Sequence, residues 1–176
     1  MKSLIKILFV YLALVALSGC CCYYFSDLTS GNKYNVGQTI ITSDFDIEVE
    51  QFQWSNNTWT STGYAEVDTR HYAQGSGNDL HSNNVNLLFL FEYPLKKIYF
   101  KFGELGGNCN VQVNDEFKNV QDLISLHNTL IGGVNFKVNA SLQGNNWYGE
   151  IVLEGTINSF KIGGQELWID DICTDK

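Results

Sequence analysis

The sequence lacks the local motifs by which the commonest catalytic and nucleotide-binding sites are identified. It contains no G-x-S-x-G nucleophile elbow, no H-E-x-x-H pair, and no phosphate-binding or dinucleotide-binding glycine pattern. Zinc-finger spacing and a strong internal repeat are also missing. No enzyme class is therefore favoured by a motif, and we expect the protein not to be an enzyme.

Positive charge is also scarce. The 176 residues include 11 Lys and Arg against 19 Asp and Glu, which gives a net charge of −8. Lys2 and Lys6 lie in an N-terminal segment that we expect to be removed, so the mature chain is more acidic still. This balance argues against nucleic acid and anionic lipid as partners. It is compatible with a cation, a neutral glycan or a basic partner.

The longest apolar run stands at the extreme N-terminus. Lys2 and Lys6 are followed by an apolar stretch over residues 7–17 and by the small residues Ser18 and Gly19. A bilayer crossing needs roughly 20 apolar residues, which is more than this run supplies. The order of basic start, apolar helix and small residues predicts a signal peptide over residues 1–19.

The end of this segment, Leu17-Ser18-Gly19-Cys20, resembles the lipobox of bacterial lipoproteins. The resemblance implies cleavage before Cys20, a lipid thioether on its sulfur and fatty acylation (palmitate) of its new amino group. Several acyl chains together anchor a protein stably. We therefore expect an exported lipoprotein held at a membrane of the cell envelope. The alternative is an ordinary secretory signal that leaves Cys20 free.

Two further cysteines, Cys109 and Cys173, lie in the part of the chain expected to fold. An exported location makes a disulfide between them a candidate pairing, with two buried free thiols as the alternative. Cys21 and Cys22 stand beside the lipidation residue and are assigned no role.

The remaining chain reads as one all-β domain. Residues 20–33 are polar and small, which predicts a lipidated tether, and residues 34–176 are expected to form the domain. Phe45, Ile47 and Val49 alternate with acidic residues, as in a half-buried strand, and the alternation slips near Phe52 and Trp54, which predicts a bulge there. Similar stretches are bounded by Gly and Asn turns, and a helical turn fits only in residues 117–127. The pattern predicts a single antiparallel, jelly-roll-like β-sandwich.

The closing stretch, residues 163–172, contains the run Leu167-Trp168-Ile169-Asp170-Asp171-Ile172. It resembles the last strand of galactose-binding-like and carbohydrate-binding jelly rolls, many of which end in an apolar-Ile-Asp-Asp-apolar run. The resemblance covers about a dozen residues. It implies a jelly-roll fold and makes a carbohydrate the expected type of ligand.

Several aromatic residues stand near predicted turns or strand ends, where flat rings are able to stack on sugars. The alternative for each is packing in the core, which we expect for Trp168 inside the final strand. The candidate ligand-binding residues are Trp54, Trp59, Tyr64, Trp147 and Tyr148.

An acidic and histidine-containing stretch follows the predicted strand 59–68. Paired carboxylates and histidine serve hydrolases that act on glycans, so this loop is the alternative, catalytic hypothesis. The simpler interpretation is that these side chains are solvated. The residues concerned are Glu66, Asp68, His71, Asp79 and His81.

No cofactor and no metal site are assigned from the sequence, although a structural calcium is compatible with it. Calcium takes six to eight oxygen ligands, and no D-x-D-x-D-G run supplies them together. The alternative is that the acids are solvated. The candidate oxygen donors are Asp44, Asp46, Asp68, Asp79, Asp170 and Asp171.

Three functional hypotheses follow. The first is a membrane-anchored, non-catalytic module that binds a carbohydrate or another surface ligand. The second is a glycan hydrolase that uses the loop after residue 68. The third is a structural or adhesion subunit whose partner is another protein. Fold alone does not choose among them.

Overall fold

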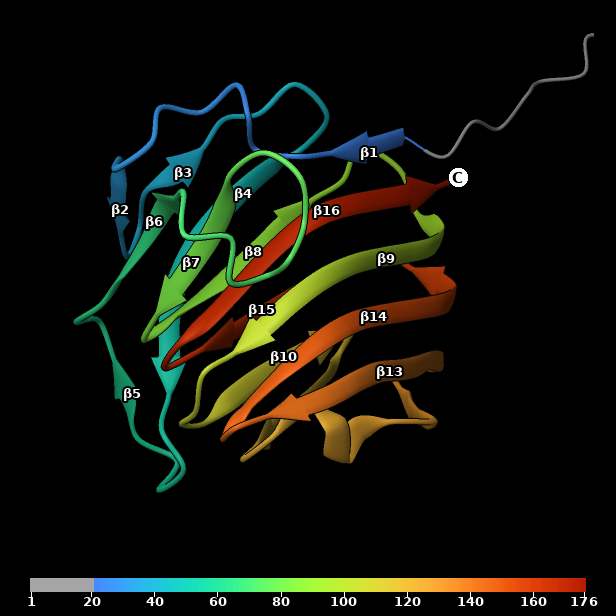
Figure 1. The fold of residues 1–176 in the computed structure, drawn as a ribbon. Helices are drawn as coiled ribbons and strands as arrows, with labels where there is room; N and C mark the ends of the chain where they lie inside the picture. Colours follow the sequence, from blue (N-terminus) through green and yellow to red (C-terminus); the bar gives the residue numbers. More distant parts are fainter. Residues whose placement is uncertain (1–20) are drawn as a thin grey trace, which may run out of the picture.

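The computed structural model describes residues 21–176, so the predicted signal segment and Cys20 lie outside the described residues. The described chain forms two antiparallel sheets packed face to face, which confirms the predicted β-sandwich. Figure 1 shows the larger sheet in front and strands of the smaller sheet behind it. The arrangement is compatible with a jelly roll. No helix in this part of the chain is long and apolar enough to span a membrane.

The larger sheet carries nine strands. In spatial order they are β12 (Thr129–Ile131), β13 (Val134–Gln143), β14 (Asn146–Ile157), β9 (Leu95–Glu104), β16 (Leu167–Asp175), β7 (Asp79–Asn83), β6 (Tyr64–Asp68) and β2 (Lys33–Asn35), with β1 (Cys21–Tyr23) paired to β16.

The smaller sheet carries seven strands. In spatial order they are β11 (Glu116–Val120), β10 (Cys109–Val113), β15 (Phe160–Gly164), β8 (Val85–Leu90), β4 (Asp46–Gln53) and β3 (Thr39–Ile40), with β5 (Trp59–Thr60) paired to β4. A 3₁₀ turn, η1 (Leu123–Leu126), falls within the segment where a helical turn was expected.

The core lies between the sheets because alternate side chains of each strand point inward. On β9, Ile98, Phe100 and Phe102 are buried. Across the interior, Phe100 meets Phe160 of the smaller sheet with ring centroids 5.6 Å apart, and Phe160 meets Phe89 at 5.5 Å. These contacts join strands that are distant in sequence. The inward-facing half of each alternating strand therefore forms the core that holds the two sheets together.

The N-terminal residues expected to form a tether belong to the sandwich instead. β1 pairs with β16, and the side chains of Tyr23 and Phe25 are buried in the core. β2 adds to the edge of the larger sheet beside β6. The predicted tether is therefore wrong for residues 21–33, because its aromatic residues supply apolar surface that the core takes up.

The cysteine pairing also differs from the prediction. Cys173 forms a disulfide with Cys22, which stands opposite it in the β1–β16 pair, and Cys109 is a buried free thiol. The predicted Cys109–Cys173 bridge is wrong because the sulfur of Cys173 is already bonded to Cys22, its partner across the β1–β16 pair. The burial of Cys109 agrees with the free-thiol alternative for that residue.

The disulfide is expected to contribute substantially to stability, because it closes a segment of 151 residues in the unfolded chain. Replacing Cys22→Ser together with Cys173→Ser should lower the free energy of unfolding by about 2–4 kcal/mol, measured by urea denaturation. Cys109→Ala is the control, since it leaves the bridge intact. A non-reduced digest should contain a linked Cys22–Cys173 peptide, and a linked Cys109–Cys173 peptide would contradict the assignment.

A buried carboxyl, Glu104 at the end of β9, should make stability depend on pH. Burial raises its pKa from 4.5 to about 7, although the Leu123 N–H donates to Oε2 at 3.0 Å. The folded state therefore holds this proton more tightly than the unfolded state does. The stabilisation is fully present below pH 4.5 and is lost as the pH rises to about 7.

Glu104→Gln should remove this dependence because it keeps the shape without the charge. The unfolding free energy of the wild-type protein should fall relative to that of the variant between pH 4.5 and 7, and the difference should then stay constant. Urea denaturation across the pH range measures it. Parallel curves for the two proteins through this range would show that Glu104 does not titrate as described.

Candidate functional site

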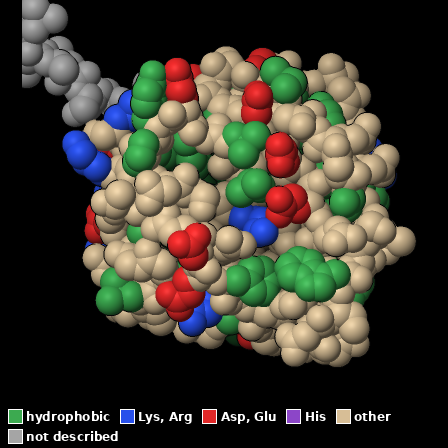
Figure 2. Space-filling view, turned by 180° about the vertical axis from the view of Figure 1, so that it is seen from behind, with side chains coloured by type: hydrophobic (Ala, Val, Ile, Leu, Met, Phe, Trp, Pro, Cys, Tyr) green, Lys and Arg blue, Asp and Glu red, His purple; other side chains and the backbone are tan. Residues whose placement is uncertain are grey.

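The outer face of the smaller sheet carries a row of side chains from five strands. In adjacent strand pairs Glu48 stands opposite Thr39 and Leu88, and Lys161 stands opposite Leu88 and Gln112. Each of these residues alternates with core residues on its own strand, so the row necessarily faces away from the core. Figure 2, which views the molecule from behind, shows acidic, basic and large hydrophobic side chains gathered on one face.

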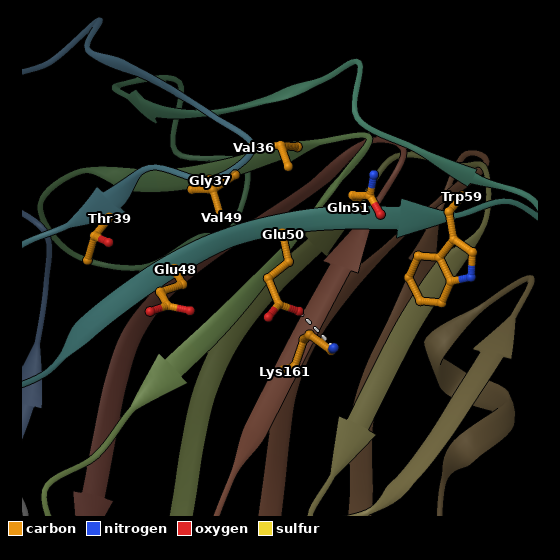
Figure 3. Close-up of a pocket in the computed structure, with 9 residues that line it drawn as sticks. All are labelled: Val36, Gly37, Thr39, Glu48, Val49, Glu50, Gln51, Trp59 and Lys161. Carbon is orange, nitrogen blue, oxygen red and sulfur yellow. Dashed lines mark hydrogen bonds and ion pairs between the residues drawn. The ribbon is translucent and has the colours of Figure 1, made fainter.

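A groove of about 590 Å³ opens on this face. Figure 3 shows Trp59 at one end of it, Thr39 toward the other, and Glu50 with Lys161 between them. The Trp59 side chain is 49% exposed, and its ring lies 5.7 Å from the ring of Phe117 on β11. The complete lining consists of Val36, Gly37, Thr39, Glu48, Val49, Glu50, Gln51, Trp59 and Lys161.

The charges in the groove do not cancel. Lys161 Nζ forms an ion pair with a Glu50 carboxylate oxygen at 2.8 Å, and the Lys161 side chain is only 14% exposed. The carboxylate of Glu48, two residues earlier on the same face of β4, has no hydrogen bond or ion pair with another described residue. The groove therefore offers one carboxylate that is held in place and a second that is free to accept hydrogen bonds from a ligand.

Buried asparagine side chains form hydrogen bonds with the main chain of the hairpin that carries Trp59. Beyond Gln51, β4 crosses the outer face of its own sheet, and Gln53 reaches Asn110 on β10. The Gln53 N–H donates to Asn110 Oδ1 at 2.8 Å, and Asn110 Nδ2 donates to the Gln53 carbonyl at 2.9 Å. Gln53 in turn pairs with Trp59 of β5. These bonds fix the end of the groove where Trp59 stands.

Two more asparagines add to these hydrogen bonds, and we call Asn86, Asn110 and Asn119 together the asparagine ladder. Asn119 on β11 donates to the carbonyls of Gln53 and Trp54 at 3.2 and 3.0 Å, and Asn86 on β8 donates to the Gln51 carbonyl at 2.7 Å. The slip in alternation expected near Phe52 and Trp54 lies at this crossing.

Gly163 leaves room for the ladder between β8 and β10. A Cβ at Gly163 would collide with the Val85 carbonyl and with Asn86, which stands opposite Gly163 on β8. Asn110 stands opposite Gly163 on the other side. The chain crossing therefore depends on a glycine at this register position.

The aromatic residues singled out in the sequence are divided between the two sheets. Trp59 lines the groove and Trp54 stands in the same hairpin, packed edge-on against Phe52 at 5.4 Å. Tyr64 is on β6 of the larger sheet, with Lys33 Nζ 4.0 Å from its ring centre. Trp147 and Tyr148 are on β14, also in the larger sheet.

Trp168 is 2% exposed, so its expected burial is confirmed, but it is buried on the outer face of the larger sheet and not in the core between the sheets, which Leu167 and Ile169 enter. Its ring stacks on His81 with centroids 3.8 Å apart, and its Nε1 donates to Asp68 Oδ2 at 2.7 Å. Asp68 also forms an ion pair with Arg70 at 2.6 Å. These contacts join β6, β7 and β16 on the outer face of the larger sheet.

The candidate catalytic acids and histidines lie mostly under a loop. Asp68, Asp79 and His81 are buried, so the interpretation of these three as solvated residues is wrong. The Ala73 N–H donates to Asp79 Oδ2 at 3.0 Å, and burial lowers the pKa of His81 to about 4. A histidine that is neutral near pH 7 lacks the imidazolium form that acts as a general acid there. His71 is exposed on the loop.

Two buried carboxylates, Asp79 and Asp170, are the best placed of the candidate calcium ligands. Asp79 Oδ1 and both Asp170 oxygens have no hydrogen-bond partner, and burial raises the pKa of Asp170 to about 8. Asp171 is engaged by Lys101 at 2.8 Å and by the Ser76 N–H. Residues 21–176 contain no group of three or more His, Cys, Asp or Glu placed for a metal ion. Calcium would need backbone or water oxygens as well, so it stays a prediction.

Most groove residues were not singled out in the sequence. In the sequence, Glu48 and Glu50 stand out only as acidic residues that alternate with Ile47 and Val49, and nothing marks Lys161 as a site residue. The outward directions of Glu48 and Lys161 are readable from the alternation, because each stands between two buried residues, whereas Glu50 has the buried Val49 on one side and the exposed Gln51 on the other. The meeting of these side chains is not readable, since β15 and β4 are neighbours of β8 rather than of each other.

Comparisons with protein-family models, with curated proteins and with solved structures find no significant match to this chain.

The asparagine ladder should be needed for both stability and the position of Trp59. Asn110→Ala removes the acceptor of the Gln53 N–H and one of the donors to the Gln53 carbonyl, and should lower the free energy of unfolding by about 2 kcal/mol. Asn145→Ala, in the exposed turn between β13 and β14, is the matched control and should change it little. Urea denaturation followed by tryptophan fluorescence measures both. Equal effects of the two substitutions would contradict this role of Asn110.

Proposed function

We propose that this protein is a membrane-anchored, non-catalytic module that binds a carbohydrate in the groove of the smaller sheet. The observation that carries the proposal is the half-exposed Trp59 at the end of a groove whose other polar groups include Glu48 and Glu50. Attachment to the membrane rests on the lipobox-like stretch that ends at Cys20. The ligand is proposed from the chemistry of the groove.

A carbohydrate suits the groove because sugars have an apolar face of C–H groups and an edge of hydroxyl groups. The exposed face of Trp59 offers the apolar surface, and carboxylate oxygens accept hydrogen bonds from hydroxyls. Gln51 adds an amide that both donates and accepts. The asparagine ladder holds these groups in place before a ligand arrives, which reduces the entropy lost on binding.

The same geometry favours binding over hydrolysis. Glycosidases place two carboxyl groups on opposite sides of the bond that breaks. Glu48 and Glu50 project from one face of the same strand, and Glu50 is committed to Lys161. On the larger sheet, Asp68 is bonded to Arg70 and Trp168. Hydrolysis from the loop after Asp68 remains the alternative, and a protein-binding adhesion subunit is the third hypothesis.

The proposal predicts that Trp59→Ala weakens retention on the glycan that the protein binds by on the order of tenfold to a hundredfold, because stacking on the ring is lost. Tyr148→Ala is the matched control, a partly buried aromatic residue on the other sheet, and should leave retention unchanged. A screen of immobilised polysaccharides measures retention and released sugar together.

The outcomes of this screen separate the hypotheses. Retention that depends on Trp59 without released sugar supports the binding module. Released sugar that is lost in a Glu66→Gln or His71→Ala variant would favour the hydrolase. An absence of both retention and release across the screen would contradict the carbohydrate proposal and favour a protein partner.

A further inference from the structure

The proposed lipid anchor joins the folded domain without a linker. β1 begins at Cys21, the residue directly after Cys20, and neighbouring Cα atoms are only about 3.8 Å apart. Because β1 is antiparallel to β16, with Cys21 opposite Thr174, the chain enters β1 beside the C-terminus. Figure 1 shows both at one corner of the sandwich. A lipid on Cys20 would therefore enter the bilayer at this corner.

The disulfide keeps this corner closed. β1 has only three residues, and by itself so short a strand would separate readily from the sheet. Cys22 is bonded to Cys173 in the middle of this pairing. The disulfide therefore keeps β1 attached to the final strand, β16. The lipid is thereby connected to the body of the larger sheet rather than to a mobile arm.

The surface around this corner is formed by two turns and the C-terminus. The Tyr23 ring contacts Phe45 at 5.4 Å, and Phe45 contacts Phe91 at 5.5 Å, which brings the turns after β3 and after β8 next to β1. Lys176 Nζ lies 5.3 Å from the centre of the Tyr93 ring. We call this the anchor-side surface: residues 41–45, 90–94 and 174–176.

The chemistry of the anchor-side surface fits lipid headgroups. Ile41, Leu90 and Tyr93 are among the few large hydrophobic side chains exposed on the described chain. Tyrosine favours the interface between headgroups and hydrocarbon because its ring is apolar and its hydroxyl is polar. Asp44 and Glu92 on the same surface would be repelled by anionic lipids, so zwitterionic headgroups are the matching partner.

The groove extends away from this surface. β4 runs from Asp46, beside the anchor-side turn, to Gln53, which pairs with Trp59. Seven strand steps correspond to about 23 Å. In Figure 1 β5 and β1 lie at opposite ends of the sandwich. A domain that rests on its anchor-side surface therefore presents the Trp59 end of the groove to the solvent.

We propose that the anchor-side surface lies on the zwitterionic headgroups of the bilayer that holds the lipid, with the Trp59 end of the groove directed away from the membrane. This orientation rests on the lipid anchoring included in the proposed function. It deepens that proposal by specifying which surface of the domain the membrane contacts and which surface remains open to a glycan.

A tryptophan added on each side of the molecule tests the orientation. The acylated full chain carrying Tyr93→Trp is placed in phosphatidylcholine vesicles that contain a nitroxide-headgroup lipid, and fluorescence quenching is measured. Leu142→Trp is the matched control, because Leu142 is 55% exposed against 54% for Tyr93. It stands opposite Trp147, which pairs with Glu104 at the far end of β9.

We expect loss of most of the emission added by Tyr93→Trp, and no loss of the emission added by Leu142→Trp or of the wild-type emission. Equal quenching of the two added tryptophans, quenching of the Leu142→Trp protein alone, or quenching of neither would overturn the orientation. Both positions are exposed, so neither substitution disturbs the core.

Two separate measurements distinguish failure of the orientation from failure of the proposed function. Mass spectrometry of the N-terminal peptide shows whether Cys20 is acylated. Acylation without selective quenching overturns the orientation alone, whereas absence of acylation overturns both the anchor and the orientation. Retention on glycan is measured independently, and its loss would contradict the groove proposal without bearing on the membrane contact.

Discussion

Burial of alternate side chains between two sheets is the constraint on which the remaining structure depends. Phe89, Phe100 and Phe160 come from three different strands and meet in the interior. Because successive side chains of a strand point to opposite faces, the residues next to each of them point outward. A shift of one residue in any of these strands would exchange core and surface, at the cost of the buried apolar area. The outward row that ends in the groove is therefore a direct consequence of core packing.

The polar interactions on the outer face add what core packing does not supply. The end of β4 leaves its own ladder and crosses the sheet, which exposes main-chain groups that need partners. Asn110 satisfies both groups of Gln53, and neighbouring asparagines satisfy the carbonyls beside it. An asparagine is suited to this because its amide has both donor and acceptor atoms, like the main chain it pairs with. The main-chain groups at this end of the groove therefore have hydrogen-bond partners, as they would in a regular strand pair.

The two outer faces of the sandwich have opposite character. The face of the smaller sheet is open and contains Trp59 with an unpaired carboxylate. The loop between β6 and β7 covers part of the face of the larger sheet, and a Cβ at Gly75 in that loop would collide with Asp170. Covering this face buries carboxyl groups that have no hydrogen-bond partner, which is costly unless they stay protonated or hold a cation. Ligand access thus favours the smaller sheet, although the larger sheet carries more of the acidic residues noticed in the sequence.

The sequence by itself determined the fold class, most strands and the outward direction of Glu48 and Glu50, because a period of two residues is a local property of the chain. Only the tertiary structure decided which cysteine joins Cys173, that residues 21–33 belong to the sandwich, and which aromatic residue shares a groove with charged groups. Each of these depends on strands that are far apart in sequence becoming neighbours. Cys22 and Cys173 are separated by 151 residues, and β1 pairs with the part of β16 that lies beyond its pairing with β7. Composition and residue spacing do not show which strands become neighbours, since strand order is determined by the packing of the whole core.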